Sequence, residues 1–261
     1  MKSINGASHD AVSCGAFEGC KITSINIPSS VEFIGEYSFY NCTALSSLIF
    51  EADSSLEIIG KNAFRNTSIK TLSIPSKVEI IDIGAFCDCD ITSLVFMPSS
   101  NLKQINGDCG YKNAMNQNVK YDGAFANNPI ATINFPASLE EIGPASFYNC
   151  KKLSIISFEK NSKLTKIEGG EAGAFMNTNL QTVDMSNCTN IKYLGPWIFY
   201  NISTLRLVKI GTITPPDTNY QENSFDGIAE VAVLKVPTES IDTYKNSWMK
   251  TNFDSITSLD E

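Results

Sequence analysis

The sequence holds eight cysteines but a single histidine, His9, so its capacity for chemistry can be assessed quickly. A serine or cysteine nucleophile needs a general base beside it, most often a histidine. His9 lies in an N-terminal segment that we expect to be frayed, so neither a Ser-His-Asp nor a Cys-His arrangement has a base in a formed site. The glycine cluster at 169–173 has neither dinucleotide-binding nor P-loop spacing. The sequence therefore predicts no catalytic residues, no cofactor and no enzyme activity.

Half of the cysteines share one position, three residues after a recurring phenylalanine. We interpret this position as a small, half-buried packing site, because other copies fill it with Thr, Asn or Ile, and we expect reduced thiols that pack like small apolar groups. A disulfide between neighbouring copies stays open, since strands about 4.8 Å apart bring such positions within bridging distance. Cys87-Asp88-Cys89 lacks CxxC spacing, so no metal site is expected. The four cysteines are Cys20, Cys42, Cys89 and Cys150.

Charge excludes further partners. The chain has 20 Lys+Arg against 28 Asp+Glu, a formal net charge of −8. A negative surface repels phosphate backbones and anionic lipid, so nucleic acid and membrane surfaces are not expected partners. No apolar stretch approaches the roughly 20 residues needed to cross a bilayer. The start, MKSINGASHDAVSCGAF, has no apolar signal-peptide core, so we expect the chain to begin inside a longer reading frame that carries any export signal or anchor.

An internal repeat supplies the elements that position these side chains. A phenylalanine, usually after a small residue, recurs with steps of 22, 25, 22, 39, 22, 28, 24 and 26 residues. About six residues after most of these comes a triplet of apolar residues at relative positions 1, 4 and 6, as in Ile22-Ile25-Ile27. A second apolar pair and a glycine follow, as in Val31-Ile34-Gly35. The phenylalanines are Phe17, Phe39, Phe64, Phe86, Phe125, Phe147, Phe175, Phe199 and Phe225.

Each unit predicts one short strand with one buried face, because apolar residues alternate at the end of the triplet. Pro28, Pro75, Pro136 and Pro237 directly follow their strands, where a missing N–H is expected to end the ladder without breaking it. A unit of about 23 residues cannot bury its own apolar face, so the copies must stack into one core. We predict a repeat solenoid, a right-handed coil with one parallel sheet, short strands and few helices.

The unit resembles the BspA-like, or treponemal-type, leucine-rich repeat, which reads roughly LxxLxLPxxLxxIGxxAFxxC. The residues that carry this resemblance are clearest in ITSINIPSSVEFIGEYSFYNC at 22–42 and IATINFPASLEEIGPASFYNC at 130–150. The resemblance extends over residues from about 14 to 236. It implies an exported, surface-attached protein of anaerobic bacteria, with adhesion to host matrix proteins or other cells as the associated role.

We divide the chain into an incomplete N-terminal segment at 1–13, the solenoid at 14–210, and the last repeat with a C-terminal cap at 211–261. A helix is expected from about Ser240 to Lys250, with Ile241, Tyr244 and Trp248 on one face. An amphipathic helix of this kind closes the end of a solenoid. The longest step predicts an insertion at about 106–122, and a shorter one lies near 168–172.

Two surfaces are candidates for binding. Residues at triplet position 3 should point outward from the sheet: Ser24, Ser47, Thr71, Ser93, Thr132, Ile155 and Thr182. A hydroxyl-rich face offers hydrogen bonds to a protein or glycan, although small β-tolerant residues also suit any exposed sheet. The two insertions should emerge on one side of the coil, and long loops on rigid scaffolds often carry function. Tyr111, Met115 and Tyr121 are the contact residues predicted there.

These features favour a monomeric, non-catalytic module that binds a protein or glycoprotein, such as a host matrix protein or another cell surface. We expect it to be extracellular or attached to a cell surface. The alternative is a cytoplasmic repeat scaffold, or a structural spacer with no ligand of its own.

Overall fold

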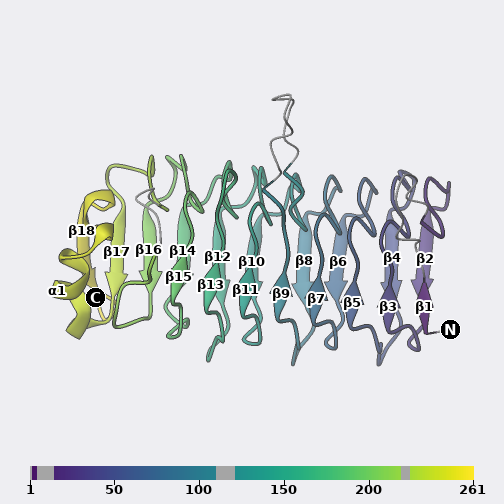
Figure 1. Ribbon diagram of the computed structural model, residues 1–261, viewed down its shortest axis with the longest axis horizontal. Coiled ribbons are helices and arrows are strands. Elements are labelled where there is room, and N and C mark those ends of the chain that lie inside the picture. Colours follow the sequence, from purple (N-terminus) through teal and green to yellow (C-terminus); the bar gives the residue numbers. More distant parts are fainter. Residues whose placement is uncertain (1, 5–14, 110–120, 219–223) are drawn as a thin grey trace.

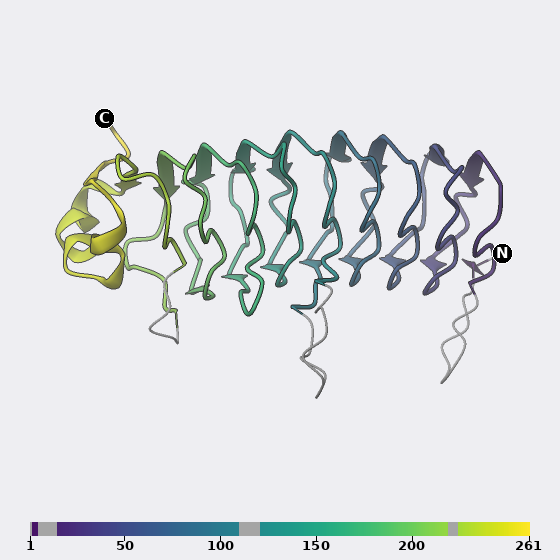
Figure 2. The same cartoon turned by 90° about the horizontal axis from the view of Figure 1, so that it is seen from above.

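The computed structural model describes residues 2–4, 15–109, 121–218 and 224–261. The chain winds into an elongated parallel β-solenoid in which each repeat forms one turn, with the N- and C-terminal turns at opposite ends (Figure 1). This confirms the predicted repeat architecture. Figure 2, which views the coil from above, shows the strands of successive turns aligned along its length and the short helix gathered at the C-terminal end.

The predicted strands form a first ladder of four-residue strands along one side of the coil. Their outward and inward residues alternate as expected, so that Leu72 and Ile74 are buried between exposed Thr71 and Ser73. Where neighbouring strands pair, the pairing is parallel and in register, as in Thr132 opposite Ile155. The strands are β2 (Ser24–Ile27), β4 (Ser47–Phe50), β6 (Thr71–Ile74), β8 (Ser93–Phe96), β10 (Thr132–Phe135), β12 (Ile155–Phe158), β14 (Thr182–Met185), β16 (Leu207–Ile210) and β17 (Val233–Val236).

The expectation of one parallel sheet was incomplete, because a second ladder runs along the opposite side. Its two-residue strands come from the second apolar pair of each repeat, and they form one uninterrupted eight-stranded sheet. It begins with the pairing of Ser3 with Phe33, so residues 3–4 already belong to the coil. The strands are β1 (Ser3–Ile4), β3 (Phe33–Ile34), β5 (Ile58–Ile59), β7 (Ile80–Ile81), β9 (Gln104–Ile105), β11 (Glu141–Ile142), β13 (Lys166–Ile167) and β15 (Tyr193–Leu194).

The repeat phenylalanines form a continuous stack inside the coil. Successive ring centroids lie 5.0–5.5 Å apart with interplanar angles of 3–20°. From Phe39 to Phe225 every ring is fully buried, whereas Phe17 at the first turn is 37% exposed. The stack fixes the distance between turns and confirms that these side chains are interior.

Two residues after each phenylalanine, the chain adopts a left-handed backbone conformation. Asn tolerates this conformation better than most residues, and Gly adopts it freely. The position is filled by Gly19, Asn41, Asn66, Asp88, Asn127, Asn149, Asn177, Asn201 and Gly227, with φ between 57° and 74°. The turn therefore accounts for the asparagines of three Asn-x-Ser/Thr sequences, those at Asn41, Asn66 and Asn201.

The C-terminal cap combines a short helix with a strand. η1 (Thr238–Ser240), α1 (Ile241–Lys245) and η2 (Trp248–Asn252) lead into β18 (Ser255–Ser258), which pairs with β17 and extends the first ladder. The helix is shorter than the predicted 240–250, but its predicted apolar face is correct. Tyr244 is buried with its hydroxyl donating to the Thr212 carbonyl at 3.1 Å, and Trp248 Nε1 donates to the Pro216 carbonyl at 2.9 Å.

The first ladder is interrupted twice, between β4 and β6 and between β8 and β10. The prediction that prolines end the ladder without breaking it was wrong at Pro75 and Pro136. Where two strands of the ladder pair, the backbone N–H of the residue after the second strand donates to a carbonyl of the preceding turn. Glu51 N, for example, donates to Ile27 O at 3.1 Å. Pro75 and Pro136 occupy the equivalent positions after β6 and β10 and have no N–H to donate. Pro237 lacks the N–H too, yet β16 and β17 stay paired, so the prediction is correct there.

Candidate interaction surfaces

The outward face of the first ladder brings the predicted contact residues into one row. Among the seven, Ser24, Thr71, Ser93, Thr132 and Ile155 are exposed, and Ser47 and Thr182 are half-buried. Parallel pairing in register aligns them, so that Thr132, Ile155 and Thr182 lie side by side. The structure thus assembles these residues as a surface, while their part in binding stays a prediction.

The same face carries large apolar side chains that the sequence analysis did not select. Ile49 is 57% exposed, Val95 49% and Met97 45%, all above the 44% of Ile155. Ile49 and Val95 occupy outward strand positions, where the alternating pattern calls for polar residues. That mismatch was the signal available in the sequence. Met97 follows β8 directly and offered no comparable signal.

Charge on this face is concentrated toward the C-terminal end and is largely paired. Lys209 Nζ lies 2.9 Å from Asp184 Oδ2 on the neighbouring strand. Burial alone would raise the pKa of Asp184, but hydrogen bonds from Ser186 and the Lys209 ammonium outweigh it and hold the pKa below its ordinary value. The most exposed apolar side chains of this face, Ile49, Val95 and Met97, lie instead in its N-terminal half.

Of the predicted insertion contacts, Tyr111 and Met115 lie outside the described residues. Tyr121 is half-buried, and its ring centroid lies 4.9 Å from that of Tyr148. The two insertions approach one another, since a Cβ on Gly170 would lie 2.9 Å from Cys109 Sγ. Asp122 N donates to Asp108 O at 3.1 Å, so the first insertion begins and ends at the same point of the coil.

This closure predicts that the central part of the insertion is dispensable for folding. Replacing residues 110–120 with two glycines should leave the free energy of unfolding within about 0.5 kcal/mol of wild type, since loop length has a small entropic cost. Chemical denaturation measures this. Removing all of 106–122 is the contrasting control: it deletes the backbone bonds of Asn106 and the ion pair of Asp122, and should be clearly destabilising. Equal stability of both deletions would contradict this assignment.

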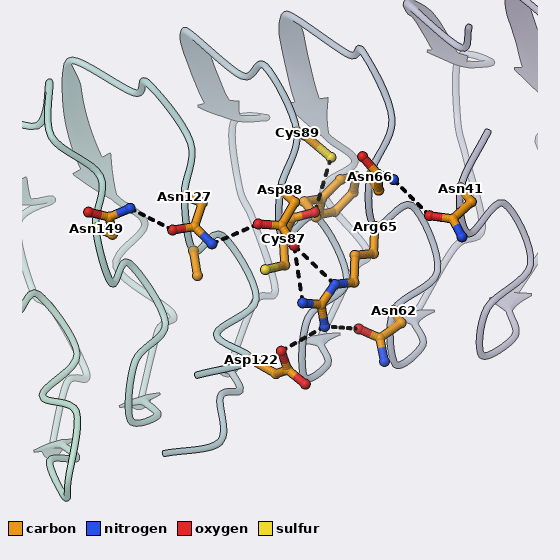
Figure 3. Close-up of polar contacts among 12 residues, drawn as sticks. Asn41, Asn62, Arg65, Asn66, Cys87, Asp88, Cys89, Asp122, Asn127 and Asn149 are labelled. Atoms are coloured by element: carbon orange, nitrogen blue, oxygen red, sulfur yellow. Dashed lines mark hydrogen bonds and ion pairs between the residues drawn. The ribbon is translucent and has the colours of Figure 1, made fainter. Parts of the chain in front are cut away.

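At the other end of the insertion, a buried arginine joins three turns (Figure 3). Arg65 is 8% exposed; its Nη1 donates to Asp122 Oδ1 at 2.7 Å and to Asn62 Oδ1 at 3.2 Å, while Nη2 donates to Asp88 Oδ2 at 3.1 Å. Asp88 also accepts from Asn127 at 2.7 Å. Every charge here has a partner within the chain, so the cluster is a structural tie between turns.

The cysteines behave as the packing interpretation predicts. All seven described cysteines are free thiols, and Cys42, Cys89 and Cys150 each donate to the carbonyl of the phenylalanine in the turn before, at 2.9–3.2 Å. Burial raises the pKa of Cys89 to about 11 and that of Cys150 to about 12, and it raises the pKa of Cys87 despite the neighbouring Arg65. Protonated thiols are poor nucleophiles and poor metal ligands.

These pKa values predict low thiol reactivity and a loss of stability at alkaline pH. At pH 8 about one in 10³ of a thiol with a pKa near 11 is ionised, so the buried cysteines should resist alkylation until the protein is denatured. Folding raises these pKa values, so the stabilisation from protonated thiols is complete below the ordinary thiol pKa and is lost as pH rises toward 11–12. The unfolding free energy should be flat from pH 6 to 8 and fall above about pH 9. Rapid labelling of Cys150 in the native state would contradict its burial.

No group of His, Cys, Asp or Glu suited to a metal ion occurs among the described residues, and His9 lies outside them. Within the described ranges, no helix has the length and apolar character to cross a membrane.

The repeat itself can now be compared with known proteins. The BspA type leucine rich repeat region matches the chain in six copies, over residues 10–121 and 118–254. The chain belongs to this family. As a BspA-type repeat protein it has the expected unit, in which the strand triplet, the second pair and the buried phenylalanine complete one turn. No curated protein matches the chain.

Solved structures similar to this BspA-type chain are bacterial leucine-rich repeat proteins or antigens. The pneumococcal vaccine antigen PcpA is 16% identical, covers 90% of this chain and 79% of its own, with a TM-score of 0.48. A leucine rich cell surface protein from Faecalibacterium prausnitzii A2-165 is 17% identical, with coverage of 99% and 88% and a TM-score of 0.38. A leucine-rich repeat protein from Bacteroides ovatus ATCC 8483 is 18% identical, with coverage of 98% and 91% and a TM-score of 0.26.

Proposed function

We propose that the protein is a non-catalytic recognition module that binds a protein or glycoprotein partner through the outward face of its first ladder. The observation that carries this proposal is the row of exposed hydroxyl and apolar side chains along the outward face of the first ladder. Apolar groups as exposed as Ile49, Val95 and Ile155 lose water favourably when a partner covers them. Among the described residues, the charges around Arg65 pair with one another and the buried thiols are protonated, so these groups offer little chemistry for catalysis.

We also propose, from the family, that the protein acts outside the cell or on its surface, with a host matrix protein or another cell surface as partner. Two of the similar solved structures are described as a vaccine antigen and a cell surface protein. Antibody labelling of intact cells of the source organism tests this location. Labelling only after lysis would favour the intracellular scaffold.

The binding proposal is tested by passing the purified chain over immobilised host matrix proteins and a glycan array. The face variant Ser93→Lys/Thr132→Lys adds charge to two exposed outward positions that do not line the cavity between β4 and β6 and should weaken binding at least tenfold. The matched control Thr43→Lys/Ser203→Lys adds the same charge at exposed turn positions away from the sheet and should bind like wild type. The variant in which two glycines replace residues 110–120 tests whether the insertion contributes to binding. If no tested protein or glycan is retained by the wild-type chain, the partner class is wrong.

A further inference from the structure

The first interruption of the ladder leaves a groove on the outward face, between β4 and β6. Leu48, Ile49 and Phe50 of β4 form one wall, and Thr71 and Ser73 of β6 form the other, around a cavity of about 430 Å³. Figure 1 shows β4 and β6 standing farther apart than β2 and β4, while β3, β5 and β7 of the second ladder stay evenly paired. The second ladder therefore holds the turns together where the first is open.

The two strands beside this groove, β4 and β6, lack the backbone pairing that joins β6 to β8. Between β6 and β8, Ser93 N donates to Lys70 O at 3.3 Å and Met97 N donates to Ile74 O at 3.0 Å. No strand pairing joins β4 to β6, both of which are described in full, and Pro75 cannot supply the closing bond. The edge of β4 that faces the groove consequently has N–H and C=O groups without a neighbouring strand. Such an edge is a template for another strand.

Two inward side chains of β4 are more accessible than their equivalents on β6. Leu48 and Phe50 occupy inward positions, yet both are half-buried, whereas the equivalent Leu72 and Ile74 of β6 are fully buried. Ile49 at 57% and Met97 at 45% are exposed at its sides. An incoming chain would cover this apolar surface, which favours binding.

The charged residues that line the groove are all acidic. Glu51 and Asp53 lie at its end, in the link that follows β4, and no Lys or Arg lines it. Glu51 is held in place, since its carboxylate accepts from Asn26 Nδ2 at 3.2 Å and from Ser29 N at 2.9 Å. Asp53 is exposed. A ligand that complements these groups carries positive charge beside its apolar residues.

We propose that this groove binds an extended peptide segment of a partner, which pairs with the free edge of β4 and combines apolar side chains with Lys or Arg. Main-chain hydrogen bonds supply affinity in this mode, and alternate side chains supply specificity. Apolar side chains of the peptide contact Ile49 and Met97, and its basic residue meets Glu51 and Asp53. The inference rests on the proposed function, because it names the kind of segment that the outward face recognises.

The test uses a synthetic peptide, acetylated at its start and amidated at its end, that alternates Lys, Val and Thr over eight residues. Two matched probes replace Lys with Glu, or carry N-methyl groups on alternate backbone amides. We expect the basic peptide to bind saturably by fluorescence anisotropy and to shift the amide NMR signals of residues 47–50. The acidic and N-methylated peptides should each bind at least tenfold more weakly, because they lack the charge or the strand donors.

Protein variants locate the site. Ile49→Lys/Asp53→Asn changes two exposed positions and should weaken peptide binding at least tenfold, with the thermal unfolding midpoint unchanged, because Asn tolerates the left-handed backbone of Asp53. Ile155→Lys is the control, an exposed apolar residue on β12, which is paired on both sides. Absence of saturable binding, or equal binding by the N-methylated peptide or by the groove variant, would overturn the proposal. So would concentration-dependent dimerisation that the groove variant abolishes, since a second copy would then be the occupant.

The outcome is separable from that of the proposed function. If a matrix protein binds wild type and the groove variant equally while the face variant loses it, the outward face functions and the groove proposal fails. If the peptide binds at the groove but no matrix protein or glycan is retained, the groove proposal stands and the partner class fails.

Discussion

Replacing Phe147 with alanine should lower the free energy of unfolding by about 3–5 kcal/mol. Its ring is fully buried, lies 5.3 Å from both Phe125 and Phe175, and meets the edge of Phe135 at 5.6 Å. Truncation removes these contacts and leaves a cavity in the centre of the stack. The neighbouring turns cannot collapse into it, because both ladders fix their spacing. Urea denaturation followed by circular dichroism measures the loss.

The matched control is Phe17→Ala. Phe17 stacks on Phe39 at 5.0 Å but is 37% exposed, so its loss should cost less than half as much. In a solenoid each turn contacts only its neighbours, so the Phe147 variant should also increase hydrogen exchange first in the flanking turns. A loss below about 1 kcal/mol for Phe147→Ala would mean that the stack does not carry the stability of the coil.

The fold could be predicted because its main signals are local and repeated. The phenylalanine and the strand triplet recur in each turn, so nine weak patterns reinforce one another and specify a stacked coil. The second ladder was missed for a physical reason. Strands such as Phe33–Ile34 are two residues long, too short to show alternation, and their pairing depends only on the stacking of whole turns.

The candidate surfaces were predictable only in part. The outward row follows from strand alternation, so Ser24 and Thr132 could be placed from sequence. The gap beside β4 could not, because the general rule that proline ends a strand does not say which neighbour loses its partner. That depends on which residue donates to the turn before, as Glu51 does and Pro75 cannot. The prolines at 75 and 136 were the available signal.

The ion pairs of Arg65 could not be predicted from the sequence, because Arg65 and Asp122 are 57 residues apart and meet only when the intervening turns stack. Arg65→Met should destabilise the protein by about 2–3 kcal/mol. Removing one partner of a buried pair leaves the other charges uncompensated. We place the value below that of a fully buried pair because the side chains of Asp88 and Asp122 retain 38% and 27% exposure. Chemical denaturation measures the change.

A double-mutant cycle separates lost charge pairing from lost packing. Asp122→Asn alone should cost about 1 kcal/mol, because it weakens one charge-assisted hydrogen bond. Adding it to Arg65→Met should recover part of the loss, since the carboxylate that the arginine neutralised is then absent. Hydrogen exchange at residues 121–124 should rise in Arg65→Met and in Asp122→Asn, because both release the end of the insertion. If the two substitutions are strictly additive, the Arg65–Asp122 ion pair contributes nothing, and the cost of Arg65→Met comes from its aliphatic chain and its contacts with Asp88 and Asn62.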